Sequence, residues 1–311
     1  MFNKLQKYET ELWTIFCILL FSIIAHGYRF VNLMFNGDSM LIYQTDQDWK
    51  YSLGRIFQPF YWKLRGDLVA PMLIGTLSVL YFTIALVLII RLFRLQNKLQ
   101  IAFLCALLAV NITITSTFAT DIHEGDTYML ALLCATLSVA AFRKAHLILG
   151  GVFICLCLGL YQAYLQVAVG LLLLLFMQDL LDGENFKKVF FSGLKSIAML
   201  LGGSIAYTLI MRFILHVKNI ALTNNYNGLA DVGDYSTTSI PNLVVKTYQY
   251  IITEWLHPQT FRSGFVGLAN AGIILLTILL FVLLLVTKVE SNSSRVLLLI
   301  LFLLFPFGIN V

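Results

Sequence analysis

Residues 147–181 read "LILGGVFICLCLGLYQAYLQVAVGLLLLLFMQDLL", an almost unbroken apolar run. A helix of about 35 residues would be roughly 50 Å long, whereas about 20 residues cross a hydrocarbon core of about 30 Å. The run is therefore too long for one ordinary membrane span. We divide it at "GLYQAYLQ", residues 159–166, into two short spans; a kink in a single tilted helix is the alternative. Two short spans and a single kinked helix both predict an all-α polytopic membrane protein.

The composition of the whole chain agrees with this prediction. Hydrophobic residues make up 59% of the 311 residues and charged residues 12%, and the mean hydropathy is +0.85. Soluble domains carry about 25% charged residues. In a membrane protein, Lys and Arg mark the flanks of spans, so the net charge of +5 is not a sign of nucleic-acid binding. We expect membrane lipid as a partner and no nucleic acid.

Apolar runs of about 20 residues predict about nine spans in one transmembrane module covering residues 1–311. The predicted spans are 12–34, 68–92, 99–119, 127–142, 147–161, 163–180, 190–214, 265–287 and 296–311. Because the sequence ends inside the last apolar run, we expect the native chain to continue beyond Val311.

The distribution of Lys and Arg predicts a cytoplasmic N-terminus, since cytoplasmic loops are enriched in these residues. Twelve of the 21 then fall on the inner side: Lys4, Lys7, Arg91, Arg94, Lys98, Arg143, Lys144, Lys187, Lys188, Lys195, Lys288 and Arg295. The outer loops are 36–66, 120–126 and 217–264. Within the last, residues 239–256 have apolar positions at helical spacing and predict an amphipathic helix in the outer interface. The functional site should therefore face outward.

The first outer loop contains three aspartates that could act on a substrate at the membrane surface. Asp38 follows "FNG" at the exit of the first span, and Asp46 and Asp48 come soon after it. A carboxylate in this place can act as general base toward an acceptor hydroxyl. The alternative is that these are solvated loop acids without a catalytic role.

Among the cations of the same loop we single out Arg55, Lys63 and Arg65, which lie on the side where positive charge is not expected. A planar guanidinium binds phosphate through two parallel hydrogen bonds. A lipid phosphate in the outer leaflet would lie at the depth of these side chains. Ordinary headgroup contact, or an ion pair with a loop aspartate, remains the alternative.

The turn "DIHEGD", residues 121–126, groups Asp121, Glu124 and Asp126 beside His123. Asp126 lies near the start of the fourth span, where it is a candidate helix cap. Oxygen ligands of this kind suit Mg²⁺, Mn²⁺ or Ca²⁺, but no metal-loop spacing is present. We therefore assign no metal site and no certain cofactor, and leave a divalent cation as the minor alternative.

Tyr161 and Gln162 lie where two short spans meet on the outer side. Short helices would leave a dip in the outer surface, with the acidic turn and these two side chains facing it. Gln162 could bind sugar hydroxyls there. A hydrogen bond to a neighbouring helix is the alternative, because this is the usual role of Gln inside a membrane.

Three stretches resemble a known family. They are "SLGRIFQPFYWKLRGDLVAPMLIGTLSVLYF" (52–82), "GDTYMLALLCATLSVAAF" (125–142) and "LGLYQAYLQVAVGLLLLL" (158–175). In order and spacing they resemble the type II glucosyltransferases of phage-encoded O-antigen modification and their bacterial relatives. The resemblance covers roughly residues 12–215, and the remainder matches by architecture alone. It implies a GT-C-like helix bundle in the bacterial cytoplasmic membrane with its active site outside.

The resemblance also implies roles for individual residues. An essential acid close to the end of the first span corresponds to Asp38, with Asp46 and Asp48 as rivals, and the acid before the fourth span corresponds to Asp126. Asp38 and Asp126 are thus the expected catalytic residues. Those expected to bind substrate are Asp46, Asp48, Arg55, Arg65, Asp121, Glu124, Tyr128, Tyr161 and Gln162.

The function implied is transfer of a sugar, glucose in most relatives, from a polyprenyl-phosphate donor to a cell-surface or lipid-linked glycan acceptor, with inversion at the anomeric carbon. Two other classes share the apolar composition. One is a transporter or flippase of a lipid-linked glycan, which requires a polar stripe through several spans. The other is a non-catalytic scaffold of a polysaccharide assembly complex, in which the outer acids could all be neutralised without loss.

Overall fold

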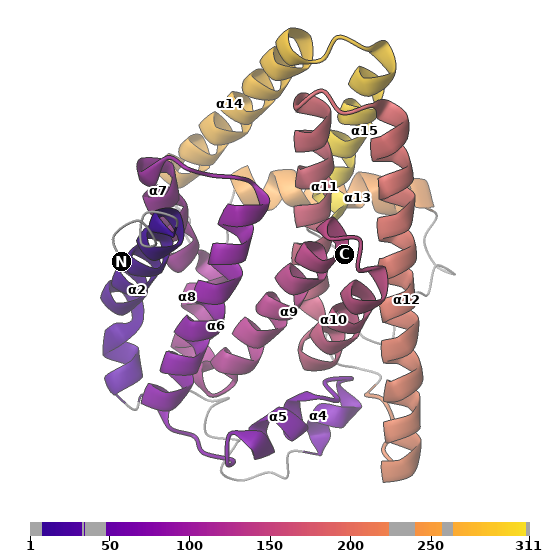
Figure 1. Cartoon of the computed structure of the whole chain (residues 1–311). Helices are drawn as coiled ribbons and strands as arrows, with labels where there is room; N and C mark the ends of the chain where they lie inside the picture. Colours follow the sequence, from indigo (N-terminus) through magenta and orange to yellow (C-terminus); the bar gives the residue numbers. More distant parts are fainter. Residues whose placement is uncertain (1–7, 33, 35–47, 224–239, 257–263, 309–311) are drawn as a thin grey trace. The chain divides into compact units, whose positions relative to one another are not determined.

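The computed structural model of the chain describes residues 8–32, 34, 48–223, 240–256 and 264–308 (Figure 1). Every regular element in these residues is helical, which confirms the predicted all-α class for this part of the chain. The elements, with η for a 3₁₀ turn, are α2 (Glu9–Val31), α4 (Trp49–Ser52), α5 (Gln58–Leu64), α6 (Pro71–Leu92), α7 (Lys98–Ala109), α8 (Ile112–Thr120), η1 (Ile122–Glu124), α9 (Gly125–Arg143), α10 (Leu147–Leu160), η2 (Gln162–Tyr164), α11 (Leu165–Leu181), α12 (Phe186–Lys218), α13 (Ile240–Leu256), α14 (Gly264–Lys288) and α15 (Asn292–Gly308).

The predicted count of nine spans is not confirmed. Among the described residues, six are long and apolar enough: α2, α6, η1 with α9, η2 with α11, α12 and α14. The pair α7 and α8 makes a seventh if it is one broken span, since the two helices meet at a bend of 42°. Both α10 and α15 are apolar but shorter. The 14 residues of α10 extend only about 21 Å, which is less than a hydrocarbon core.

One compact unit comprises residues 1–168 and 198–223. Its central helix is α9, which packs between α6 and α10, while α6 packs in turn on α2 (Figure 1). Most side chains of α9 are buried on all sides, as expected for a helix without a polar face in the middle of a bundle. Apolar side chains of α2 and α6, such as Ile24 and Met72, are exposed, which suits surfaces that face lipid.

The predicted break in the long apolar run is confirmed. The helix α10 ends at Leu160, Tyr161 is extended with φ −160° and ψ 113°, and η2 leads into α11. A single kinked helix is therefore the wrong alternative. The same arrangement precedes α9, where α8 ends at Thr120 and η1 follows Asp121. Both 3₁₀ turns lie at the end of the bundle that also carries α4 and α5, which we call the site end (Figure 1).

The second unit comprises residues 169–197 and 224–311, of which the structure describes 169–197, 240–256 and 264–308. The amphipathic helix predicted over 239–256 is confirmed as α13. Within this unit the Tyr248 hydroxyl donates to the carbonyl of Leu303 on α15, and the rings of Phe281 and Phe302 stack 3.9 Å apart. Helix α14 exposes apolar residues along its whole length.

Candidate functional site

Residues 48–66, the described part of the loop predicted over 36–66, form two short helices, and the turn between them has a specific cause. Gly54 adopts φ +75°, a left-handed conformation that glycine tolerates best. The N–H of Gly54 donates to the carbonyl of Tyr51, and the N–H of Arg55 donates to the carbonyl of Lys50. These two bonds form a Schellman motif, which ends α4. The motif therefore brings Arg55 back toward Lys50, five residues earlier.

Helix α5 begins immediately afterwards, with Pro59 in its first turn, where the missing N–H costs nothing. Its residues Gln58, Trp62 and Arg65 recur at spacings of four and three, so they share one face. That face lies against the start of α9, where the Trp62 indole N–H donates to the hydroxyl of Thr127 at 3.0 Å.

Glu124 is the residue around which this contact is built. One carboxylate oxygen accepts from Arg55 Nη1 at 2.9 Å and from Gln58 Nε2 at 2.8 Å. The other accepts from the ammonium of Lys50, with Nε2 of His123 3.4 Å away. The side chain of Glu124 is almost completely buried. One carboxylate thus ties α4, the turn and α5 to the start of α9.

Asp126, in the first turn of α9, forms a second buried pair. Arg65 Nη1 lies 2.6 Å from one carboxylate oxygen, and the Tyr61 hydroxyl donates to the other at 2.9 Å. The first oxygen also accepts from the backbone N–H of Thr127. Arg65 additionally donates to the carbonyl of His123 at 3.3 Å. Asp126 is therefore not the helix cap that its position suggested, since it lies within the first turn and Glu124 occupies the N-cap position.

We call Lys50, Arg55, Arg65, Glu124 and Asp126 the charge cluster. Its three cations face two carboxylates, so these residues carry one positive charge in excess when His123 is neutral. Within the described part of the chain, the buried Nε of Arg65 has no hydrogen-bond partner. Buried donors are nearly always paired, so an unpaired one together with excess positive charge favours an anion at this place.

Burial shifts the pKa of Lys50, which belongs to the charge cluster, and of Tyr61, which is bonded to Asp126. It lowers the pKa of the Lys50 ammonium from 10.5 to about 8, against the opposing effect of the Glu124 carboxylate. Burial, and then the negative charge of Asp126, raises the pKa of the Tyr61 hydroxyl. Tyr61 therefore stays protonated and keeps donating to Asp126, whereas Lys50 loses its charge under mildly alkaline conditions.

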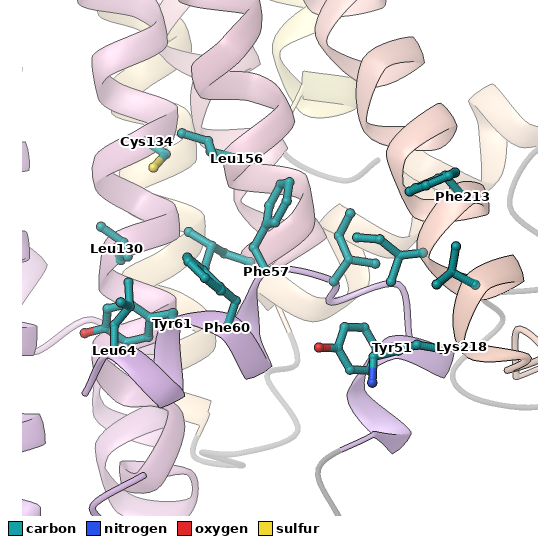
Figure 2. Close-up of a pocket in the computed structure, with 14 residues that line it drawn as sticks. Tyr51, Phe57, Phe60, Tyr61, Leu64, Leu130, Cys134, Leu156, Phe213 and Lys218 are labelled. Carbon is teal, nitrogen blue, oxygen red and sulfur yellow. The ribbon is translucent and has the colours of Figure 1, made fainter. Parts of the chain in front are cut away.

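An apolar groove of about 710 Å³ adjoins the charge cluster. Its lining residues are Tyr51, Ile56, Phe57, Phe60, Tyr61, Leu64, Leu130, Cys134, Leu156, Leu160, Phe213, Ile214, Val217 and Lys218. Figure 2 shows Tyr51 and Lys218 together on one side and Leu130 and Cys134 of α9 on the other. The Lys218 ammonium lies 4.4 Å above the Tyr51 ring. Tyr61 belongs to both features, because it lines the groove and also binds Asp126.

Comparison with known proteins decides the family. The family model described as glucosyl transferase GtrII matches residues 27–311. This chain belongs to that family. The match continues through the residues that the sequence analysis could assign by architecture alone. Neither the curated proteins nor the solved structures that were searched include a match. The GtrII family identifies a membrane glycosyltransferase of the glucosyltransferase type.

The GtrII chain brings many of the predicted site residues together. Arg55 Nη1 donates to the Tyr128 hydroxyl at 3.2 Å, and its guanidinium lies 4.7 Å from the centre of the Tyr161 ring. The rings of Tyr128 and Tyr161 stack 4.2 Å apart. Predicted residues that share this one region are Arg55, Arg65, Glu124, Asp126, Tyr128, Tyr161 and Gln162.

The other predicted acids lie apart from the charge cluster or outside the described residues. The Asp48 side chain is about half exposed and pairs with Lys218 at 3.0 Å. Asp121 accepts from the Thr120 hydroxyl and is close enough to Lys50 to raise that ammonium's pKa. Asp38 and Asp46 lie outside the described residues. No group of three or more His, Cys, Asp and Glu side chains in the described ranges could hold a metal ion.

Sequence reasoning missed four residues of this site: Lys50, Gln58, Tyr61 and Trp62. One signal could have found three of them, because Gln58, Tyr61 and Trp62 stand at helical spacing from Arg65 in an aromatic segment. Helical spacing of this kind is not expected in an exposed loop without regular structure. For Lys50 the sequence offers no comparable signal, since its partner Glu124 is 74 residues away.

Replacing Glu124 by Gln should destabilise the fold strongly. The change leaves Lys50 and Arg55 buried without a counter-charge, which costs about 3 kcal/mol or more. The matched control is Glu184→Gln, because Glu184 pairs with Lys188 at an exposed site and should lose less than about 1 kcal/mol. Chemical unfolding in mixed micelles measures both. Equal losses in the two variants would contradict the role given to Glu124.

Proposed function

We propose that this chain transfers glucose from a polyprenyl-phosphate carrier to a glycan acceptor at the outer surface of the bacterial cytoplasmic membrane. One observation carries the proposal: a buried cluster with excess positive charge adjoins an apolar groove at the same end of the bundle. A lipid-linked sugar phosphate has the matching chemistry, since it joins an anionic head to a hydrocarbon chain. The distribution of Lys and Arg along the sequence supports the outward orientation.

The charge cluster would bind the phosphate of the donor. Guanidinium groups form paired hydrogen bonds with phosphate oxygens, and the unpartnered Nε of Arg65 is such a donor. As the sugar is transferred, the bond between its anomeric carbon and the phosphate oxygen breaks, and the electron pair leaves with the phosphate. Fixed cations at this place stabilise the developing charge, an effect that is large in a site with little water.

The groove would hold the first isoprene units of the carrier. Its lining is apolar apart from two tyrosines and Lys218, which sit where a chain would meet its charged head. Its volume of about 710 Å³ lies in the range of pockets that enclose drug-sized ligands, about 300–1,000 Å³. Tyr61 marks the junction because it contacts the groove and the charge cluster at once.

For the acids, we propose different roles. Asp38 would act as general base: it takes the proton of the acceptor hydroxyl while that oxygen attacks the anomeric carbon opposite the phosphate, which inverts the sugar's configuration. Asp126 would act through Arg65 and Tyr61, because both its oxygens are already bonded and its side chain is fully buried. Its effect on the substrate would be to hold α5 and the guanidinium of Arg65 in place.

Neutralising either acid should impair transfer, and the two variants should do so in different ways. Asp38→Asn should reduce kcat at least about 100-fold, which is the usual contribution of a general base. Asp126→Asn should weaken donor binding, because Arg65 loses its partner. Asp67→Asn is the matched control, since Asp67 is an exposed aspartate whose left-handed backbone Asn also tolerates. The measurement is transfer from polyprenyl-phosphate glucose in membranes at equal expression, and near-normal rates in both variants would refute this site.

Filling the groove should affect long carriers selectively. Ile214→Trp narrows the groove, so the KM should rise for a donor with a long isoprenoid chain and stay unchanged for a donor whose phosphate carries a methyl group in place of the isoprenoid. Leu209→Trp, on an exposed part of the same helix α12, is the control and should change neither value. An equal increase of KM for both donors in Ile214→Trp would place the carrier elsewhere.

Donor binding should weaken as the pH rises through about 8. The lowered pKa of Lys50 means that its ammonium loses charge there, and the charge cluster then has no positive excess. The donor's phosphodiester does not titrate in this range, so the KM for donor should rise about tenfold between pH 7 and 9, as expected for one lost charged interaction. The Lys50→Met variant should have a high KM for donor at both pH values. A wild-type KM independent of pH contradicts the assignment.

A further inference from the structure

The turn that carries Arg55 is held from two other elements by a short relay of hydrogen bonds. The hydroxyl of Tyr207 on α12 donates to the carbonyl of Gly54 at 2.9 Å. Nε2 of Gln162, in η2, donates to the carbonyl of Leu53 at 2.9 Å and to the Tyr207 hydroxyl at 3.1 Å. Two consecutive carbonyls of the turn are thus bound by side chains more than 100 residues away in the sequence.

The relay uses every donor that these side chains have. Gln162 has two amide hydrogens, one for Leu53 and one for Tyr207. Tyr207 has one hydroxyl hydrogen, which goes to Gly54, so its oxygen is free to accept from Gln162. Successive bonds that point the same way strengthen one another in a buried environment. Gln162 therefore has only its carbonyl oxygen left for any sugar.

Gly54 fits this relay closely. A Cβ atom at this position would lie 2.6 Å from the Tyr207 hydroxyl and 2.8 Å from Gln162 Nε2. The glycine is therefore needed for two independent reasons, its positive φ of 75° and the close approach of both relay groups. A residue with a side chain would displace the groups that hold the turn.

The relay holds the turn that directly precedes Arg55, a member of the charge cluster. Arg55 follows Gly54 directly, bonds to Glu124 and lies over the ring of Tyr161, the neighbour of Gln162. Helix α12, which supplies Tyr207, also lines the groove with Phe213, Ile214, Val217 and Lys218. One helix thus forms a groove wall and holds the turn before Arg55.

We propose that Gln162 and Tyr207 are positioning residues that fix the guanidinium of Arg55 relative to the groove. They act on the donor phosphate only through the Leu53–Gly54 carbonyls and Arg55. This assignment rests on the proposed function for its effect on transfer, but the relay itself is a property of the fold. The two parts can therefore be tested separately.

The relay is tested without any substrate by hydrogen exchange. Tyr207→Phe removes the donor to Gly54, so amides of the peptide covering residues 50–58 should exchange roughly threefold to tenfold faster. Tyr164→Phe is the matched control, because the buried Tyr164 hydroxyl has no partner among the described residues and its removal should leave this peptide unchanged. Equal exchange in wild type and Tyr207→Phe would overturn the relay.

The effect on the reaction is tested by a double-mutant cycle. Tyr207→Phe and Arg55→Lys should each lower kcat/KM for the lipid-phosphate donor about tenfold, and the double variant should lose little more than Arg55→Lys alone. Additive losses would show that Tyr207 does not act through Arg55 and would overturn the proposal. A wild-type protein without transfer activity would instead refute the proposed function, while the exchange result would still decide whether the relay exists.

Discussion

The structure of the site end depends on a buried carboxylate. Taking Glu124 out of water is unfavourable, and the cost is offset only because Lys50, Arg55 and Gln58 all donate to it. These donors come from α4, from the turn and from α5, so one side chain fixes three consecutive pieces of the connection between α2 and α6. Without the carboxylate, two cations would be left buried and unpaired, and the segment would have to leave the bundle. The same contact that holds the fold therefore keeps positive charge at the proposed site.

The contacts at the site end depend on two breaks between helices, at η1 and at η2. Inside a membrane, backbone N–H and C=O groups must find partners within the protein, so a chain that leaves the helix needs side chains or turns to satisfy them. Here the 3₁₀ turns η1 and η2 continue into α9 and α11. A polar side chain from each turn, Glu124 from η1 and Gln162 from η2, forms hydrogen bonds with the segment that carries α4 and α5. Both turns contact the segment that carries α4 and α5 at the site end of the bundle.

Much of this could be predicted from the sequence, and the limits have physical causes. The apolar runs and the break near Tyr161 follow from helix length alone, and the acidic turn stood out because acids are rare in this chain. The count of nine full spans is not confirmed, because two of the predicted spans, α10 and α15, are apolar helices shorter than a full span. The sequence also could not show that Glu124, rather than Asp126, binds side chains from α4, from the turn and from α5. That depends on which hydrogen-bond donors lie against it from 66 to 74 residues away, and local patterns carry no information about such pairings.

Under the proposed function, the pairing of the cations with carboxylates would suit them to bind the phosphate of the donor. Three bare cations would repel one another and would be mobile, whereas Glu124 and Asp126 hold the guanidinium groups in fixed directions and leave a single positive charge in excess. In the proposed reaction, a fixed, modest excess would favour the more negative transition state over the bound donor, because the groups need not reorganise as the phosphate departs. A lipid-linked donor adds a second requirement, since its chain must stay in apolar surroundings while its head reaches the cations. Tyr61 and helix α12 meet that requirement because each contributes to the groove and also to the groups that hold Arg65 or Arg55 in place.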